Sequence, residues 1–222
     1  MVAEQLTSPA SMQQVSVKTL VNFPVSSNCY ILRKSGTNSC IIVDPACGPG
    51  DHIHEYLLKE KIIPQYIVLT HEHWDHISSV EYIRGQYKCK LIASRICSES
   101  ICSPKKNLSV FYDQKGFACL PADIIIEDGY SSFSWDDLMI EFHATPGHSA
   151  GGICFSIGEK LFTGDTLMKE YKAFVKLPGG NKDELQRSID LLFRKYDGDT
   201  DVFPGHGYPF KLKEANNLTI ND

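Results

Sequence analysis

Apolar runs along the chain predict a series of short strands. Val15, Val17, Thr19 and Val21 alternate with more polar residues, which is the pattern of a half-buried strand. Residues 66–70 (Tyr-Ile-Val-Leu-Thr) form a continuous apolar run, which is typical of a strand buried on both faces. Similar runs, bounded by turn residues, predict strands over 28–33, 40–43, 90–93, 124–127, 138–142, 153–157, 160–163 and 202–203.

Apolar residues at helical spacing predict helices between these strands. One covers 53–57 and ends before Pro64, and a second has Ile77, Val80 and Ile83 on one face, with Asp75 as its cap. Asn181 and Glu184 predict the start of a third helix, over 185–193, and 211–216 fits a terminal helical turn. Strands in two groups with flanking helices suit an α/β (α+β) fold, a four-layer αββα sandwich of two sheets covered by helices.

Two stretches depart from this regular pattern. Residues 95–121 have little periodicity, and we interpret them as a long insert or lid beside the site described below. Residues 1–14 are polar and have neither a basic nor an apolar segment of a secretory signal, so we expect a flexible N-terminal arm. At this length, residues 15–222 can form a single domain.

Charge and cysteine content narrow the class of protein. The net charge of −5 argues against nucleic-acid binding through a basic surface, and no apolar stretch approaches the ~20 residues of a membrane span. The eight cysteines are scattered without a C-x-x-C pair, which favours reduced thiols and a cytoplasmic location. We expect Cys40 and Cys154 to be small core residues, and Cys97 and Cys102 have no partner pair at zinc-site spacing.

A cluster of candidate metal ligands follows the buried run 66–70. The sequence is His71-Glu72-His73-Trp74-Asp75-His76, where about 0.2 histidines would be expected by chance in six residues. In extended chain His71 and His73 point the same way, and His76 then falls in the first turn of the next helix. Four potential ligands converge on a small volume, which predicts a metal site.

Three later motifs also follow predicted strands, and each taken alone fits a simple turn. They are Thr145-Pro146-Gly147-His148-Ser149, Phe162-Thr163-Gly164-Asp165-Thr166 and Pro204-Gly205-His206-Gly207. Together with His-x-His-x-Asp-His, and in this order from about 15 to 216, the pattern resembles the metallo-β-lactamase superfamily. The resemblance implies the αββα architecture, with metals at one edge between the sheets.

The resemblance also implies a ligand set, carried over residue by residue. His71, His73 and His148 would hold one metal, Asp75, His76 and His206 the second, with Asp165 bridging the pair and Asp75 also assigned a catalytic part. Such nitrogen and oxygen ligands suit two zinc ions, and would also accept iron or manganese. At the ~3.5–4 Å separation of such sites, one bridging water becomes a hydroxide near neutral pH and attacks the substrate.

Asp44 and three further histidines lie outside this ligand set. Asp44 closes the run 40–43 and resembles the family aspartate that orients a ligating histidine; a turn residue before Pro45 is the alternative. His52, His54 and His143 match no motif, so we expect surface or packing roles for them.

The resemblance to glyoxalase II and its small relatives favours hydrolysis of a small thioester such as S-lactoylglutathione. Leu177-Pro178-Gly179-Gly180-Asn181 is similar to a segment of those relatives, whereas 168–172 lacks their usual Gly-Arg pair. The chain also has no room after His206 for the C-terminal domain of full-length glyoxalase II. An acid at Asp165 argues against a true β-lactamase, and His73 argues against a flavodiiron oxygen reductase.

Three classes of function stay open at this point. The first is a dinuclear zinc hydrolase of a thioester, lactone or similar ester. The second is a mononuclear iron persulfide dioxygenase that uses His71, His148 and Asp165. The third is a metal-binding module without catalysis. In the first two classes the partner is a small-molecule substrate, with no nucleic acid and no membrane.

Overall fold

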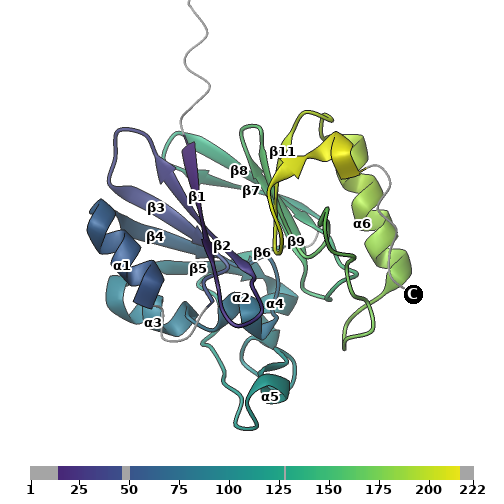
Figure 1. Cartoon of the computed structure of the whole chain (residues 1–222), viewed down its shortest axis with the longest axis horizontal. Coiled ribbons are helices and arrows are strands. Elements are labelled where there is room, and N and C mark those ends of the chain that lie inside the picture. The colour runs from purple at the N-terminus through teal and green to yellow at the C-terminus, as the bar shows by residue number, and fades with distance from the viewer. Residues whose placement is uncertain (1–14, 47–50, 128, 216–222) are drawn as a thin grey trace, which may run out of the picture.

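Two six-stranded sheets form the centre of the protein, which is known from a computed structural model that describes residues 15–46, 51–127 and 129–215 (Figure 1). The first sheet contains, in order, β1 (Val15–Val21), β2 (Asn28–Lys34), β3 (Ser39–Val43), β4 (Ile63–Val68), β5 (Lys90–Ser94) and β6 (Ile124–Ile126). The second contains β12 (Phe210–Lys211), β11 (Asp201–Pro204), β10 (Lys160–Gly164), β9 (Ile153–Ile157), β8 (Leu138–Ala144) and β7 (Tyr130–Trp135).

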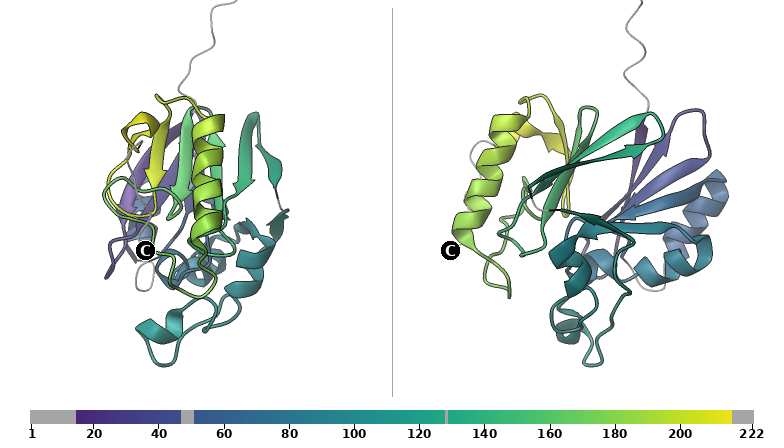
Figure 2. Two further views of the ribbon diagram at one scale, coloured as in Figure 1. Left: turned by 90° about the vertical axis from the view of Figure 1, so that its right-hand side faces the viewer. Right: turned by 180° about the vertical axis from the view of Figure 1, so that it is seen from behind.

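The helices are α1 (Asp51–Glu60), α2 (Trp74–Ile77), α3 (Val80–Tyr87), α4 (Arg95–Ser100), α5 (Ser109–Tyr112), α6 (Lys182–Lys195) and the 3₁₀ turn η1 (Leu212–Ala215). Helices α1 and α3 lie on the first sheet and α6 lies along the second (Figures 1 and 2). The predicted αββα sandwich is therefore confirmed. None of the helices in the described ranges is long and apolar enough to cross a bilayer.

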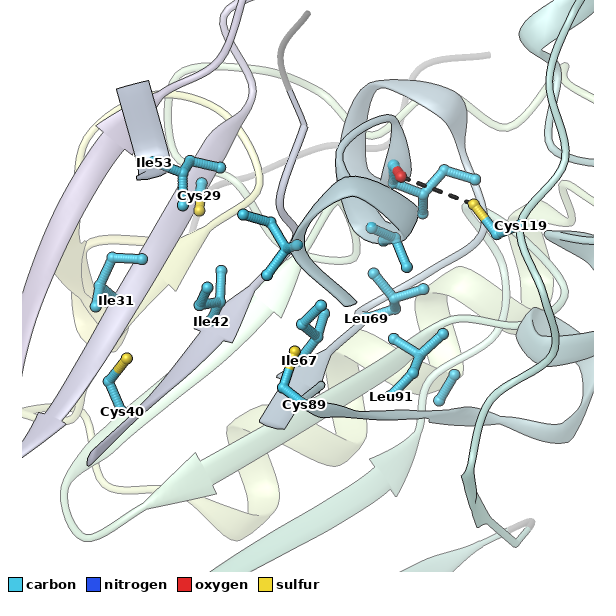
Figure 3. Packing of buried hydrophobic residues seen from close by; sticks show 14 of the residues in the cluster. Cys29, Ile31, Cys40, Ile42, Ile53, Ile67, Leu69, Cys89, Leu91 and Cys119 are labelled. Atoms are coloured by element: carbon cyan, nitrogen blue, oxygen red, sulfur yellow. Dashed lines mark hydrogen bonds between the residues drawn. The ribbon is translucent and has the colours of Figure 1, made fainter. Parts of the chain in front are cut away.

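Three apolar layers hold the sandwich together. Between the sheets, the rings of Phe155 and Phe162 stack at 4.7 Å, and Phe162 stacks in turn on Phe203 at 4.9 Å. Under α6, Leu192 packs with strand residues of the second sheet. Figure 3 shows the layer outside the first sheet, where Ile42, Ile67 and Leu91 of the strands and Ile53 of α1 belong to one buried cluster. Complete burial of such side chains contributes about 1.5–3 kcal/mol each.

Most of the cysteines in the described ranges belong to these layers, and Cys102 is exposed. Cys40, Cys89 and Cys119 lie in the outer layer of the first sheet (Figure 3), and Cys154 lies under α6. The seven cysteines in the described ranges are free thiols, and burial raises the pKa of Cys154 to about 12. The core positions predicted for Cys40 and Cys154 are confirmed; Cys47 lies outside the described residues.

Strand direction brings the ends of five strands to one edge. In the first sheet β3 and β4 are parallel. In the second, β8 and β10 both run antiparallel to β9, and β11 is parallel to β10, so these three run the same way. The start of β2 reaches the same edge, since Ser27 forms a bridge with His206. The segments that follow β3, β4, β8, β10 and β11 therefore meet between the sheets.

Several sequence predictions were wrong or incomplete. Strand β7 was missed because its alternating serines, in Tyr130–Trp135, give a weak apolar signal on an edge strand. The helix expected around 77–83 is two helices, α2 and α3, separated at Ser78 and Ser79. The insert 95–121 contains α4 and α5. The predicted arm, 1–14, and Asn216 lie outside the described residues.

Asn181 is the N-cap of α6, as predicted. Its side-chain oxygen accepts hydrogen bonds from the backbone N–H groups of Asp183 and Glu184, at 3.0 and 3.1 Å. Leu185 and Leu192 are buried on the inner face of the helix, while Arg194 and Lys195 occupy its last turn. Basic residues at this end are favoured by the helix dipole.

Candidate metal centre

The loop after β4 has a different helix start from the predicted one. His73 is the N-cap of α2 with an extended backbone, and it makes no side-chain cap. Asp75 therefore lies in the first turn of α2, and its predicted role as the cap is wrong. The shift by two residues leaves its carboxylate beside two imidazoles, those of His76 and His206, instead of beside backbone N–H groups.

His71, His73 and His148 form the first group of potential ligand atoms, which all lie within 4.8 Å of one another. Nε2 of His148 is 3.0 Å from Nδ1 of His73. Nδ1 of His148 is 2.8 Å from the carbonyl oxygen of Phe174. A carbonyl only accepts, so Nδ1 of His148 carries the proton and Nε2 presents a lone pair.

Asp75, His76 and His206 form the second group, again within 4.8 Å. Oδ2 of Asp75 lies 3.3 Å from Nε2 of His206 and 3.5 Å from Nε2 of His76. Backbone contacts fix His206: Ser27 bridges to it, and Gly205 N–H bonds to the carbonyl of Gly164 at 2.7 Å. This ties the end of β11 to the end of β10.

Asp165 lies between the two groups. Its Oδ2 is 3.4 Å from Nε2 of His148 and 3.6 Å from Nε2 of His206, and its Oδ1 is 3.5 Å from Nε2 of His76. A glycine is needed beside it, because a Cβ at position 205 would lie 2.0 Å from Oδ1. The structure thus brings all seven predicted ligands into one centre.

Asp44 lies behind the ligands and contacts the residues that orient them. It is 2% exposed, and its carboxylate accepts hydrogen bonds from Thr70 N (2.8 Å) and Thr70 Oγ1 (2.6 Å). Nδ1 of His76 lies 3.0 Å from Asp44 Oδ2, and Nδ1 of His71 lies 3.0 Å from Thr70 Oγ1. Since the threonine donates to Asp44, it accepts from His71. Both imidazoles therefore direct Nε2 into the centre, as a metal-ligating histidine requires.

Two buried groups at the centre were missed by sequence reasoning, Thr70 and Glu72. The carboxylate of Glu72 accepts hydrogen bonds from Ser149 Oγ at 3.0 Å and Gly151 N at 3.3 Å. It thereby ties the loop of His71 and His73 to the loop of His148. The only signal in the sequence was its place inside the histidine cluster, since alternation gave no partner for it.

The donor atoms fit a bound cation. Nε2 of His71, Nε2 of His76 and Oδ1 of Asp165 are buried and make no hydrogen bond. Buried polar atoms are rarely left unpaired, and lone pairs that converge on one volume are satisfied by a metal ion.

The electrostatics of the two groups differ. Burial, then neighbouring imidazoles, lower the pKa of His71 far below its usual range and that of His73 to about 3. Burial also opposes charge on His76, but Asp75, Asp165 and the hydrogen bond to Asp44 outweigh it and raise its pKa to about 10. For Asp75, burial favours the neutral acid, yet His76 and His206 outweigh it and lower its pKa. His71 and His73 are thus neutral and ready to donate lone pairs.

The other histidines have structural positions away from the centre. His143 on β8 is buried and packs against the rings of Tyr130 and Tyr196. His54 on α1 lies with Nδ1 2.8 Å from the hydroxyl of Tyr87, and His52 is on α1 too. The packing interpretation agrees with these positions.

The insert 95–121 contacts the ligand loop directly. Trp74 N–H bonds to the carbonyl of Asn107 at 2.9 Å, and the Trp74 ring stacks on Tyr112 of α5 at 4.0 Å. The side chain of Asn107 in turn bonds to the carbonyls of Ile101 and Phe117. The insert is therefore braced by its own hydrogen bonds against the ligand loop.

Imidazole and carboxylate groups gathered at the strand ends of an αββα sandwich define a class of metal-binding proteins. The family model described as metallo-beta-lactamase superfamily matches residues 22–206, and the chain belongs to this superfamily. It is accordingly a metal-dependent hydrolase by family.

Known relatives cover most of the chain. The probable polyketide biosynthesis zinc-dependent hydrolase BaeB of Bacillus velezensis is 30% identical over 183 residues, which are 82% of this chain and 74% of the relative. Hydroxyacylglutathione hydrolase of Hamiltonella defensa is 28% identical over 205 residues, 91% of this chain and 72% of the relative. The crystal structure of the B3 metallo-beta-lactamase BLEG-1 aligns with a TM-score of 0.83 at 25% identity, over 90% of this chain and 95% of that one.

Proposed function

We propose that the chain is a dinuclear zinc hydrolase of thioesters. The observation that carries this proposal is the position of Asp165, whose carboxylate lies within 3.4–3.6 Å of Nε2 atoms from both groups of ligands. His71, His73 and His148 would hold one ion, and Asp75, His76 and His206 the other, with Asp165 shared. When bound, two such ions supply a water of lowered pKa and a Lewis acid for the substrate carbonyl.

The chain's own residues orient the donors. Asp44 and Thr70 fix the rings of His71 and His76, and the Phe174 carbonyl fixes that of His148. Glu72 holds two ligand loops together. We also propose a catalytic part for Asp75, beside His206, as an ionised carboxylate of the second ligand group, because its lowered pKa keeps it charged.

The thioester assignment rests on two similarities. Hydroxyacylglutathione hydrolase is a relative over most of this chain, whereas the zinc-dependent hydrolase BaeB supports only zinc and hydrolysis. The segment Leu177–Asn181 lies against the loop of His148, since Asn181 N–H bonds to the carbonyl of Gly147 at 2.7 Å. Hydrolysis adds water to the carbonyl carbon and breaks the C–S bond, giving a carboxylate, a released proton and a free thiol.

Titration of metal-free protein with known amounts of zinc, followed by activity assays, tests this proposal. We expect two zinc ions per chain, and thiol release from a thioester panel that includes S-lactoylglutathione, with lactones and a chromogenic cephalosporin as comparison substrates. One ferrous ion with oxygen consumption would instead support the persulfide dioxygenase. No turnover of any substrate with both metals bound would support a metal-binding module without catalysis.

A further inference from the structure

Exposed aromatic side chains lie on the segments that carry the ligands. Tyr171, between β10 and α6, is 52% exposed, and its ring centroid is 6.1 Å from that of His206. A Cβ at Gly207 would lie 3.3 Å from Cε2 of the tyrosine, so the tyrosine ring lies next to the loop that follows His206. One half-exposed ring therefore borders the second group of ligands.

Phe174 borders the first group. Its carbonyl oxygen is 2.8 Å from Nδ1 of His148, which places this residue directly beside a ligand. Its side chain is 44% exposed although it is apolar. Neighbouring Ala173 is buried with Leu185 of α6, so the segment is anchored and the phenylalanine is left at the surface.

Trp74 and Tyr112 add a third apolar position. Trp74 stands between the ligands His73 and Asp75, and its ring stacks on Tyr112 with an interplanar angle of 14°. Tyr112 is 56% exposed. The three positions therefore neighbour ligands of both groups: Trp74 along the chain, Phe174 through its carbonyl and Tyr171 through its ring.

Arginine, which binds carboxylates with two parallel hydrogen bonds, is absent from these segments. The chain has arginine at 33, 84, 95, 187 and 194, all outside 71–77, 107–115 and 165–180. Among the lysines of these segments, Lys169 pairs with Glu214, while Lys115, Lys172 and Lys176 are exposed. A thiol conjugate with two carboxylates, such as glutathione, would meet lysines there and no arginine.

We propose that the substrate is a thioester with an apolar acyl chain, which packs against Tyr171, Phe174 and the Trp74–Tyr112 pair, and that glutathione is not the preferred thiol. This inference rests on the proposed thioester hydrolysis. Exposed rings beside a polar centre lower the free energy when an apolar group covers them, because their exposed faces leave water. An acyl chain is the part of a thioester that can do so.

Hydrolysis of S-acyl-N-acetylcysteamine thioesters tests the inference. We expect kcat/KM of the zinc-loaded protein to rise at least about tenfold from the acetyl to the decanoyl thioester, and to exceed that for S-lactoylglutathione. Tyr171→Ala and Phe174→Ala should each lower decanoyl kcat/KM about fivefold to tenfold through KM, and lower that of the acetyl thioester by a smaller factor. Met139→Ala is the matched control, because Met139 is 54% exposed at the other end of β8.

Binding of a thioether gives a readout that needs no turnover. The chain has two tryptophans, and Trp135 is buried between the sheets, so a Trp135→Phe background leaves Trp74 as the reporter. S-decyl-N-acetylcysteamine should change Trp74 fluorescence at concentrations at least about tenfold below the S-methyl compound, with weaker binding after Tyr171→Ala.

The outcomes separate the two proposals. Chain-length-dependent binding without hydrolysis of any thioester would overturn the proposed function and keep the apolar site. Hydrolysis that is fastest for S-lactoylglutathione, and that falls when Lys172 and Lys176 are replaced by alanine, would overturn the apolar site and keep the function. Equal binding of the decyl and methyl compounds would also overturn the proposed apolar site.

Discussion

Replacing Asp44 by asparagine should detach His76 from the metal without unfolding the protein. The carboxylate accepts from Thr70 N on Oδ1, and from Thr70 Oγ1 and His76 Nδ1 on Oδ2. The asparagine side chain keeps its carbonyl oxygen toward Thr70 N–H, because its NH₂ group cannot accept a hydrogen bond there. Its NH₂ then faces Nδ1 of His76, which must become the acceptor. The ring proton moves to Nε2, the atom that points into the centre.

The size of the effect follows from this change of tautomer. Loss of a group that orients a ligating histidine costs about 10–100-fold in metal affinity, or about 1.4–2.7 kcal/mol. The backbone should tolerate the change, because Asp44 has φ of 50° and asparagine adopts this left-handed region readily. We therefore expect a fall in affinity that exceeds any change in the stability of metal-free protein.

Competition with a chromophoric chelator measures affinity for the first and second zinc separately, and thermal unfolding of metal-free protein measures stability. Asp136→Asn is the control, since Asp136 has φ of 53° in a surface turn and pairs with Lys34 away from the centre. Unchanged affinity for both ions in Asp44→Asn, with full occupancy, would refute the assignment of the His76 proton.

Four further outcomes are expected. Asp165→Ala should abolish activity and lower metal content in elemental analysis, and an unchanged rate would rule out a shared ligand. His143→Ala should keep activity within about tenfold, because its buried ring packs against Tyr130 and Tyr196 and not at the metal centre; a larger loss would mean a misplaced ligand. Glu72→Ala should lower the free energy of unfolding by about 2–4 kcal/mol, since it leaves two buried donors unpaired; chemical denaturation in the metal-free state checks this. Chelation of the metals should lower Tm, and zinc should restore it, unless the ions contribute nothing to the folded state.

Short-range pattern was a good guide to individual elements and a poor guide to their limits. Alternation and continuous apolar runs identified the central strands, because side-chain direction repeats every two residues. Strand β7 was not predicted, because its serines give little difference in polarity between the two faces of the strand. The start of α2 at Trp74 was misplaced because Asp75, a frequent capping residue, is used at the centre instead of at the backbone.

Of the residues that hold the ligands in place, the sequence predicted only some. Asp44 was identified from its place after a strand, and its contacts with Thr70 and His76 agree with that prediction. Glu72 was passed over, since its partners Ser149 and Gly151 lie more than seventy residues away along the chain. Nothing in local spacing encodes such a pair.

The sequence by itself determined the kinds of donor, their order along the chain and their attachment to strand ends, because these depend on local residue pattern. Only the tertiary structure decided that the ends of β3, β4, β8, β10 and β11 share one edge, which depends on strand direction across two sheets. The proton positions on His76 and His148 were decided there too, by Asp44 and by the carbonyl of Phe174, which are distant in sequence. Those contacts form only when β3 pairs with β4 and the segments after β8 and β10 lie together.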